Sequence, residues 1–126
     1  MKLLLDISVI IDFLRKRNKN ETLFARLIAP KHEFYMSILT YAELFSGKSV
    51  WENKALLNDL NELCSDFHIQ SIDRTVAQKA GAIRAHLHTD LIDSIIAATA
   101  IENRCELVTL NVKDFAKIPH LKLFSE

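Results

Sequence analysis

The sequence predicts one α/β domain with a mainly parallel sheet of about five strands and helices on both faces of it. Short apolar or alternating segments of strand length take turns with longer segments in which apolar residues recur at helical spacing. Strands that are separated by helices need crossover connections, and such connections produce a parallel sheet that is covered on both faces. The 126 residues are enough for one domain, which we place over residues 1–126, and too few for two.

Caps and helix breakers set the expected boundaries of these elements. Ser8 is interpreted as the cap of the first helix, Pro30 ends the second, and Asp73 caps the helix that follows the third strand. The expected strands lie at residues 2–5, 33–37, 67–72, 106–110 and 121–124. The expected helices begin near residue 8, cover 23–28, run from about 38 to Gly47, lie within 51–65, follow Asp73, run from about Asp90 to Asn103 and make one turn before Pro119.

Composition indicates a cytoplasmic globular protein and excludes some classes of function. The 16 basic and 16 acidic residues cancel, so no overall positive field indicates a nucleic-acid partner, although an acidic site can mask basic residues elsewhere. Only two glycines are present, which argues against a glycine-rich phosphate loop. Cys64 and Cys105 lie far apart and are expected to be reduced thiols. No apolar run resembles a membrane span or a secretion signal, and we expect no membrane partner.

Acidic residues follow several of the predicted strands. Asp6 comes directly after the first strand, Glu43 lies shortly after the second, and Asp93 begins the helix before the fourth. Ligands of parallel sheets bind at the carboxyl ends of the strands, so these acids are expected at one edge. The helix behind Asp93 is apolar almost all round, which places the acids at its start at an interior edge. Further candidates at this edge are Asp90, Thr109, Asn111 and Asp114.

Each of these residues also has an ordinary structural interpretation. Asp6 suits the N-terminus of a helix, and Thr40 with Glu43 has the spacing of a capping box. Asn111 and Asp114 are typical of turns and helix caps. Together, however, they predict several carboxylates at one edge, which are costly to bury unless a cation such as Mg²⁺ or Mn²⁺ neutralises them. The residues alone leave a nuclease, a phosphotransfer enzyme and simple cation binding open.

Four segments in a fixed order carry a family resemblance that covers essentially the whole chain. The segments are residues 3–12 with Asp6 near the centre, 37–47 around Ala42-Glu43-Leu44, 93–100 beginning Asp93-Ser94-Ile95, and 108–111 continuing to Asp114-Phe115. On these motifs the chain resembles the PIN-domain ribonucleases, and particularly the VapC-type toxins of prokaryotic toxin–antitoxin pairs. The resemblance implies a PIN-like fold and metal-dependent endonucleolytic hydrolysis of RNA.

The resemblance also assigns roles to residues of this sequence. Asp6, Glu43 and Asp93 would be catalytic residues and ligands of one or two Mg²⁺ or Mn²⁺ ions, which would activate the attacking water and offset charge on the phosphodiester. Asn111 takes the fourth catalytic position, where many members have Asp, and either its carbonyl or Asp114 through a water would complete the site. Ile7 stands where the family usually has Thr or Ser, which removes a hydroxyl beside the first acid. Residues expected to support the ligands or their waters are Asp12, Asp90, Thr109 and Asp114.

Expected partners follow from the same resemblance. They are a tRNA or ribosomal RNA substrate, a VapB-like antitoxin, and a second copy of the chain in a homodimer. Arg15, Lys16 and Lys48 are candidate contacts to RNA phosphates, although basic residues near helix ends are also typical of solvated surfaces. Arg84 and Lys113 are weaker candidates of the same kind.

Three other interpretations compete with this one. A catalytically impaired PIN module that acts by partner binding is compatible with Ile7. A phospho-receiver-like signalling domain also uses acids at strand ends with Mg²⁺, but it needs an Asp that closes the third strand, where this chain has Asp73 in a capping position. A zinc site at His86 and His88 is disfavoured, because residues two apart on a helix face opposite ways and zinc prefers three or four converging ligands.

Overall fold

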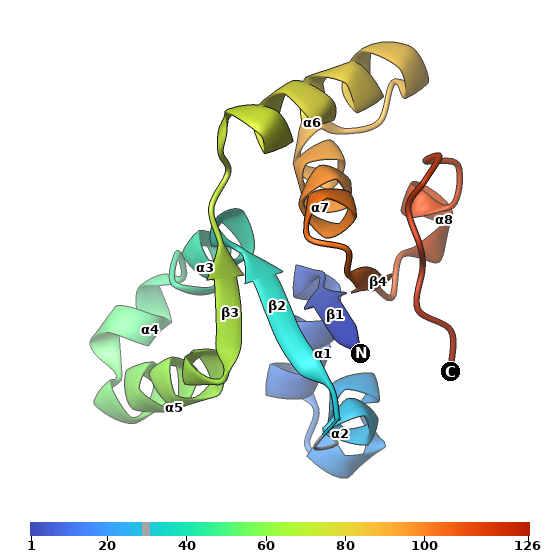
Figure 1. The fold of residues 1–126 in the computed structure, drawn as a ribbon. Helices are drawn as coiled ribbons and strands as arrows, with labels where there is room; N and C mark the ends of the chain where they lie inside the picture. Colours follow the sequence, from blue (N-terminus) through green and yellow to red (C-terminus); the bar gives the residue numbers. More distant parts are fainter. Residues whose placement is uncertain (29–30) are drawn as a thin grey trace.

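The computed structural model describes residues 1–28 and 31–126, and the predicted helix end at Pro30 lies outside them. In the described residues four strands form one parallel sheet in the order β3-β2-β1-β4. The strands are β1 (Lys2–Leu5), β2 (Glu33–Ser37), β3 (Phe67–Gln70) and β4 (Glu106–Val108). The predicted parallel α/β fold is confirmed. Because the strands are parallel, their carboxyl ends share one edge, near α3 and α7 (Figure 1).

The predicted fifth strand is wrong. Residues 121–124 do not form a strand, and Leu123 makes one isolated parallel bridge to Leu107. Beside this bridge Leu107 donates its amide to the carbonyl of Lys122 at 2.8 Å and accepts from the amide of Phe124 at 2.9 Å. β4 has only three residues and offers little backbone for further pairing. The segment at residues 121–124 therefore lies along β4 without adding a fifth strand to the sheet.

The helices follow the predicted order, with one interruption. Asn53 ends one helix and caps the next, and its Oδ1 accepts from the amide of Leu56 at 3.2 Å, so the helix expected within residues 51–65 is two helices. The helices are α1 (Ile7–Arg15), α2 (Leu23–Leu27), α3 (Ile38–Leu44), α4 (Lys48–Glu52), α5 (Lys54–Ser65), α6 (Arg74–Leu87), α7 (Leu91–Glu102) and α8 (Val112–Phe115), with a 3₁₀ turn at Lys19–Glu21.

The two predicted N-caps have different outcomes. Asp73 caps α6 as predicted, because its Oδ1 accepts from the amide of Val76 at 2.9 Å. Ser8 is not a cap: α1 already begins at Ile7, and Asp6 occupies the cap position. The Ser8 hydroxyl lies inside the first turn and donates back to Asp6.

The sheet separates two layers of core, as the side chains of β1 show. Leu3 and Leu5 point into a layer with α1, α2 and α5, whereas Leu4 points into a layer with α7. Along α7 nearly every side chain after the first turn is buried, and the alanines allow close packing on the sheet. The rigid strand β1 therefore fixes the position of the residue that follows it, which is Asp6.

Two further expectations concern the cysteines and the membrane. Cys64 and Cys105 are both buried and free, as expected for thiols. In residues 1–28 and 31–126, every helix is too short or too polar to cross a membrane.

Candidate active site

Asp6 is the first residue after β1, and only 6% of its surface is exposed. Its amide donates to the carbonyl of Val108 at 2.9 Å, which continues the pairing of β1 with β4. The carboxylate does not cap α1. Instead, Oδ2 accepts from the hydroxyl of Ser8 at 2.9 Å and from the hydroxyl of Thr109 at 2.7 Å. Asp6 therefore stands at the N-terminus of α1 as its structural interpretation predicts, but its carboxylate makes no capping hydrogen bond, and in the described residues no donor engages its Oδ1.

Ser8 and Thr109 tie the ends of β1 and β4 together through this carboxylate. Leu110 donates its amide to Oγ of Ser8 at 3.1 Å, and Asn111 donates its amide to Oγ1 of Thr109 at 3.0 Å. Each hydroxyl thus accepts from a backbone amide and donates to the same carboxylate oxygen. Thr109 is among the residues predicted to support a metal ligand or its water, whereas Ser8 is predicted only as a helix cap. The available signal was a serine two residues after an acid at a strand end, a spacing typical of local side-chain hydrogen bonds.

The absence of a hydroxyl at Ile7 does not leave Asp6 without hydroxyl donors. Ile7 is half-buried and packs against the core layer that contains Leu3 and Leu5. Ser8, one position later, supplies a hydroxyl to the carboxylate, and Thr109 supplies a second. The departure at Ile7 therefore changes which residue supports Asp6 and not whether it is supported.

Glu43 lies near the end of α3 and does not belong to a capping box. α3 begins directly after Ser37, whose hydroxyl oxygen accepts a backbone amide at 3.1 Å and caps the helix. Thr40 is consequently inside the helix, so the capping interpretation of Glu43 is wrong. The pKa of Glu43 is raised, first by burial and then by the negative charge of Asp6. The two carboxylates therefore lie within electrostatic reach of each other.

Asp93 lies in the first turn of α7 and senses four other acids. Its pKa is raised to about 6, mainly by burial and then by the charges of Asp6, Asp90, Asp114 and Glu43. A charge shifts the pKa of another group only when the two lie close together, so the five acidic side chains share one edge of the sheet. Asp90 occupies the cap position of α7, but its side chain makes no capping hydrogen bond. We call Asp6, Glu43, Asp90, Asp93 and Asp114 the acid cluster.

The acid cluster has the chemistry of a site for a hard divalent cation. All its donors are carboxylate oxygens, and burial together with the repulsion between the acids raises the pKa of Asp93 and of Glu43. In the described residues no three acid, histidine or cysteine side chains stand close enough together to hold a metal ion in this structure. His86 is engaged within its own helix, because its Nδ1 lies 2.8 Å from the carbonyl oxygen of Ala82.

The remaining predicted residues lie at different distances from the cluster. Asn111 is exposed at the cap position of α8 and touches Thr109 through its amide, without a side-chain cap. Asp12 is on α1, and its Oδ1 lies 3.8 Å from Nζ of Lys16. Arg15 and Lys16 are at the far end of α1, roughly 13 Å along the helix axis from Asp6. Lys48 begins α4 and is exposed. Asp12 is not among the charges that raise the pKa of Asp93.

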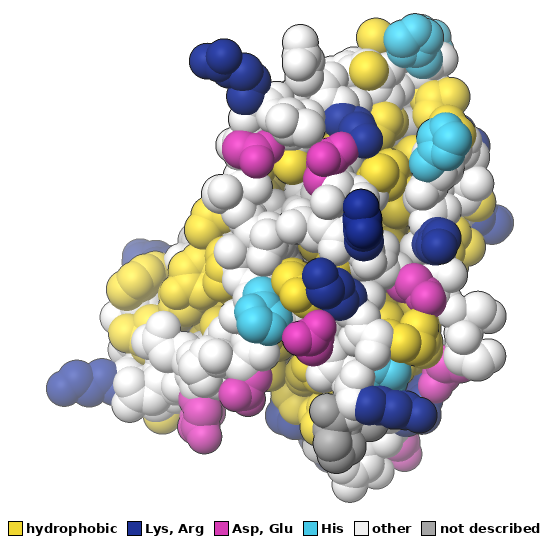
Figure 2. All heavy atoms as spheres, in the orientation of Figure 1, with side chains coloured by type: hydrophobic (Ala, Val, Ile, Leu, Met, Phe, Trp, Pro, Cys, Tyr) yellow, Lys and Arg dark blue, Asp and Glu magenta, His cyan; other side chains and the backbone are white. Residues whose placement is uncertain are grey.

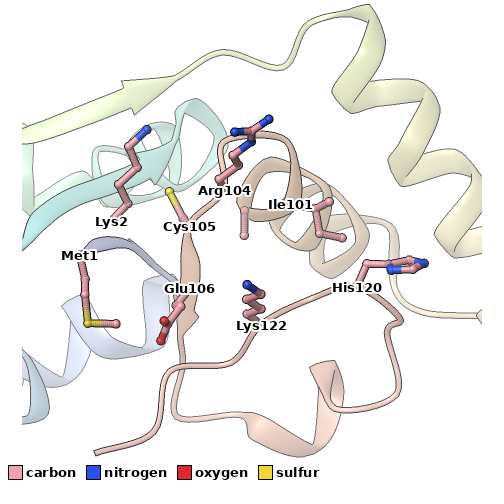
Figure 3. Close-up of a pocket in the computed structure, with 9 residues that line it drawn as sticks. Met1, Lys2, Ile101, Arg104, Cys105, Glu106, His120 and Lys122 are labelled. Atoms are coloured by element: carbon pink, nitrogen blue, oxygen red, sulfur yellow. The ribbon is translucent and has the colours of Figure 1, made fainter.

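Two cavities adjoin the acid cluster, and a third lies at the opposite edge of the sheet. The first, of about 280 Å³, includes Asp90, Asp93 and Lys117 in its lining, and the second, of about 410 Å³, is lined by residues 110–114. The third, of about 350 Å³, lies at the amino ends of β1 and β4 (Figure 3). Glu106 is the only acid among the described residues that line it, so it cannot host carboxylate chemistry of the kind found around Asp6.

Comparison with known proteins gives one family for this chain. Residues 3–121 match the family described as PIN domain. The chain is 32% identical over 120 residues to ribonuclease VapC19 of Mycobacterium tuberculosis, covering 94% of this chain and 96% of that protein. It is also 32% identical over 92 residues to ribonuclease VapC10 of the same organism, covering 69% of this chain and 66% of that protein.

Solved structures agree with this family. A toxin–antitoxin complex from Klebsiella pneumoniae has a chain of 32% identity that superimposes with a TM-score of 0.75 and covers 94% of both chains. The DNA-bound VapBC of Salmonella typhimurium superimposes with a TM-score of 0.81 at 23% identity, covering 98% of this chain and 97% of that one, which shows a shared fold. The phospho-receiver-like alternative is wrong, because the fold is that of PIN domains and Asp73 is engaged as a cap.

Proposed function

The chain belongs to the PIN-domain family, and we propose that it is a metal-dependent endoribonuclease acting as the toxin of a VapBC-type toxin–antitoxin pair. Relatives named as VapC ribonucleases and a related toxin–antitoxin complex support this proposal. The observation that carries it is the gathering of acids at the carboxyl edge of the sheet. Asp6 directly follows β1, and one cavity at this edge is lined by Asp90, Asp93 and Asp114. Burial and the charges of the other four acids raise the pKa of Asp93, which agrees with this arrangement.

In this proposal Asp6, Glu43 and Asp93 are the catalytic residues and hold Mg²⁺ or Mn²⁺. When bound, the ion supplies activation of the attacking water and offsets charge on the phosphodiester. Carboxylates are the ligands that these ions prefer, and the five members of the acid cluster offer oxygen donors. A fourth position falls to the carbonyl of Asn111 or, through a water, to Asp114.

Hydrogen bonds and helix packing within the chain hold the acidic side chains in place without a metal ion. Ser8 and Thr109 donate to Oδ2 of Asp6 and fix the carboxylate, while no described group donates to Oδ1. The first turn of α7 presents Asp93, and the buried body of that helix fixes its direction. Such preorganised support typically accounts for a factor of about 10 to 100 in metal affinity or activity.

Partners and location are extensions of the same proposal. The substrate is RNA, with tRNA or ribosomal RNA as the first classes to examine, and the toxin pairs with a VapB-like antitoxin. Structures of relatives as toxin–antitoxin complexes support the antitoxin, and a homodimer is proposed by family analogy alone. Two free, buried cysteines fit a reducing cytoplasm.

The test is cleavage of a mixed tRNA and ribosomal RNA pool by the purified protein. Reactions contain Mg²⁺, Mn²⁺ or EDTA, and Asp93→Asn and Asp6→Asn are compared with Asp59→Asn, a matched change at an exposed acid of α5. We expect discrete cuts that require metal, vanish in the first two variants and persist in the third. Circular dichroism confirms that each variant is folded.

Two outcomes would overturn the proposal. Activity retained in Asp93→Asn would refute the site. A folded protein that cuts no RNA with either metal would favour a PIN module that acts only through its partner.

A further inference from the structure

An RNA backbone has to approach an edge that carries five acids. Phosphodiesters and carboxylates repel each other, so cations are needed along the approach. The chain has a formal net charge of zero, and on the face in Figure 2 the basic and acidic side chains are interspersed without a continuous basic patch. We therefore consider the cations that lie close to the acid cluster.

One cavity beside Asp93 contains two such cations. Its volume is about 280 Å³, and its described lining is His88, Thr89, Asp90, Asp93, Lys113, Asp114 and Lys117. Lys113 lies in α8 and Lys117 lies in the turn that follows this helix, and both line the cavity, while Phe115 and Ile118 are buried in the core. Nζ of Lys117 donates to the carbonyl of Leu87 at 3.2 Å, which holds it at the rim next to the end of α6.

Within the described residues, neither lysine forms an ion pair with the acids that line the same cavity. Ion pairs within the described part of the chain are Lys16–Asp12, Arg26–Glu126 and Lys79–Glu102. Lys113 and Lys117 are in none of them, although Asp90, Asp93 and Asp114 line the same cavity. Their charges are thus available to a ligand.

The twelve-residue helix α7 adds a second favourable element at this cavity. Asp90, in the cap position, makes no side-chain capping bond, so the amides of the first turn are left without that acceptor. The positive end of the helix dipole also favours an anion there. The two lysines and the N-terminus of α7 therefore both favour an anion in this cavity.

We propose that Lys113 and Lys117 bind phosphate groups of the RNA backbone beside the acid cluster, so that the neighbouring phosphodiester meets Asp93. This inference rests on the proposed ribonuclease function and extends it to the substrate contacts. A cavity of about 280 Å³ suits one phosphate and its sugar better than a whole nucleotide, since ligand pockets start at about 300 Å³. The second cavity shares Lys113 and Asp114 and continues past Leu110 and Val112, both 50% exposed, which gives the strand a path along α8.

Binding is measured apart from cleavage, by fluorescence anisotropy of a labelled single-stranded RNA oligomer in EDTA. Lys113→Gln, Lys117→Gln and the double variant are compared with Lys54→Gln, an exposed lysine at the start of α5. We expect each single variant to bind about 3- to 10-fold more weakly at 0.1 M salt. The slope of log affinity against log salt falls by about 0.7 for each lysine removed. Lys54→Gln binds like the wild type.

Steady-state cleavage of the same RNA with Mn²⁺ provides the second measurement. We expect KM to rise more than kcat falls, because the lysines contact parts of the substrate that do not react. Variants with the affinity and salt slope of the wild type would overturn the subsite, and continued cutting would leave the ribonuclease intact. A wild type that binds RNA through these lysines without cutting it would instead refute the proposed function and support the subsite. A wild type that neither binds nor cuts RNA would refute both.

Discussion

The hydroxyl of Thr109 donates a 2.7 Å hydrogen bond to Oδ2 of Asp6, joining residues that are 103 positions apart in the sequence. Both residues are buried, with 9% and 6% of their surfaces exposed. Hydrogen bonds to charged groups are short and contribute roughly 1.5 to 3 kcal/mol. The position of the first acid after β1 therefore depends on the residue that follows β4.

Replacing Thr109 by Val should weaken both the fold and the metal site. The change keeps the shape of the side chain but removes one of two hydroxyl donors to a buried carboxylate, so we expect a loss of about 1 to 3 kcal/mol in the free energy of unfolding. Mn²⁺ affinity should fall about 10- to 100-fold. Urea unfolding in EDTA and calorimetric Mn²⁺ titration measure the two effects. Thr109→Ser restores the donor and should recover most of both, whereas equal losses in Ser and Val variants would contradict the hydrogen-bond explanation.

Sequence patterns predicted the strand bounds and the helix cap that depend on neighbouring residues alone. β1 and β2 have the predicted bounds, and Asp73 caps α6, because three or four neighbouring residues determine each of these features. The edge on which the acids gather also followed from parallel pairing. Whether a hydroxyl caps its own helix is less local: Ser8 turns back to Asp6 partly because Leu110 arrives from β4 and donates to it.

Two features of the site depend on the assembled fold. The spacing of Thr40 and Glu43 is that of a capping box, but Ser37 is left free at the end of β2 and takes the cap, which starts α3 earlier. Lys117 has no motif around it, and only the packing of α8 beside α7 brings it to the cavity of Asp93. Sequence spacing cannot show such proximity.

Restoring a hydroxyl at position 7 should change little. Ile7→Thr introduces the residue type usual in the family, but Oδ2 of Asp6 already accepts from Ser8 and Thr109. We expect cleavage within about threefold of the wild type and a loss of about 1 kcal/mol in stability, because Ile7 packs on the core layer below β1. Initial cleavage rates and urea unfolding test this. A gain of more than tenfold in activity would show that the two hydroxyls do not replace the missing one.

Divalent metal should stabilise the folded chain. The acids around Asp93 repel one another, and an ion that binds only the native state raises the melting temperature by mass action. At about 100 times its dissociation constant Mn²⁺ adds about 2.7 kcal/mol. Thermal unfolding with Mn²⁺ and with EDTA should show a clear shift in the wild type and in Asp59→Asn. The shift should be much smaller in Asp93→Asn, and equal shifts in all three would place the ion elsewhere.

The stability of the metal-free protein should fall as pH rises from about 4 to about 6. The pKa of Asp93 is about 6 in the fold and about 3.9 in the unfolded chain, so in this window the native state holds a proton that the unfolded state has released. Above the folded pKa of about 6, ionised Asp93 lowers the free energy of unfolding by its full amount. Because Asp93 is partly exposed, we expect this loss to be only about 1 kcal/mol. Urea unfolding of wild type and Asp93→Asn in EDTA gives the difference. A difference that stays constant from pH 4 to 8 would contradict the raised pKa.

Thr40→Val should act in the opposite direction to Thr109→Val. Thr40 is completely buried, and its hydroxyl has no hydrogen-bond partner in the described residues, so the folded state carries the cost of an unsatisfied polar group. Val has the same shape and removes that group, and we expect the free energy of unfolding to stay equal or to rise by up to about 1 kcal/mol. Cleavage should stay within about twofold, because Glu43 is positioned by the α3 backbone. Urea unfolding of both variants decides: a loss of more than 1 kcal/mol in Thr40→Val would mean that its hydroxyl is bonded in solution.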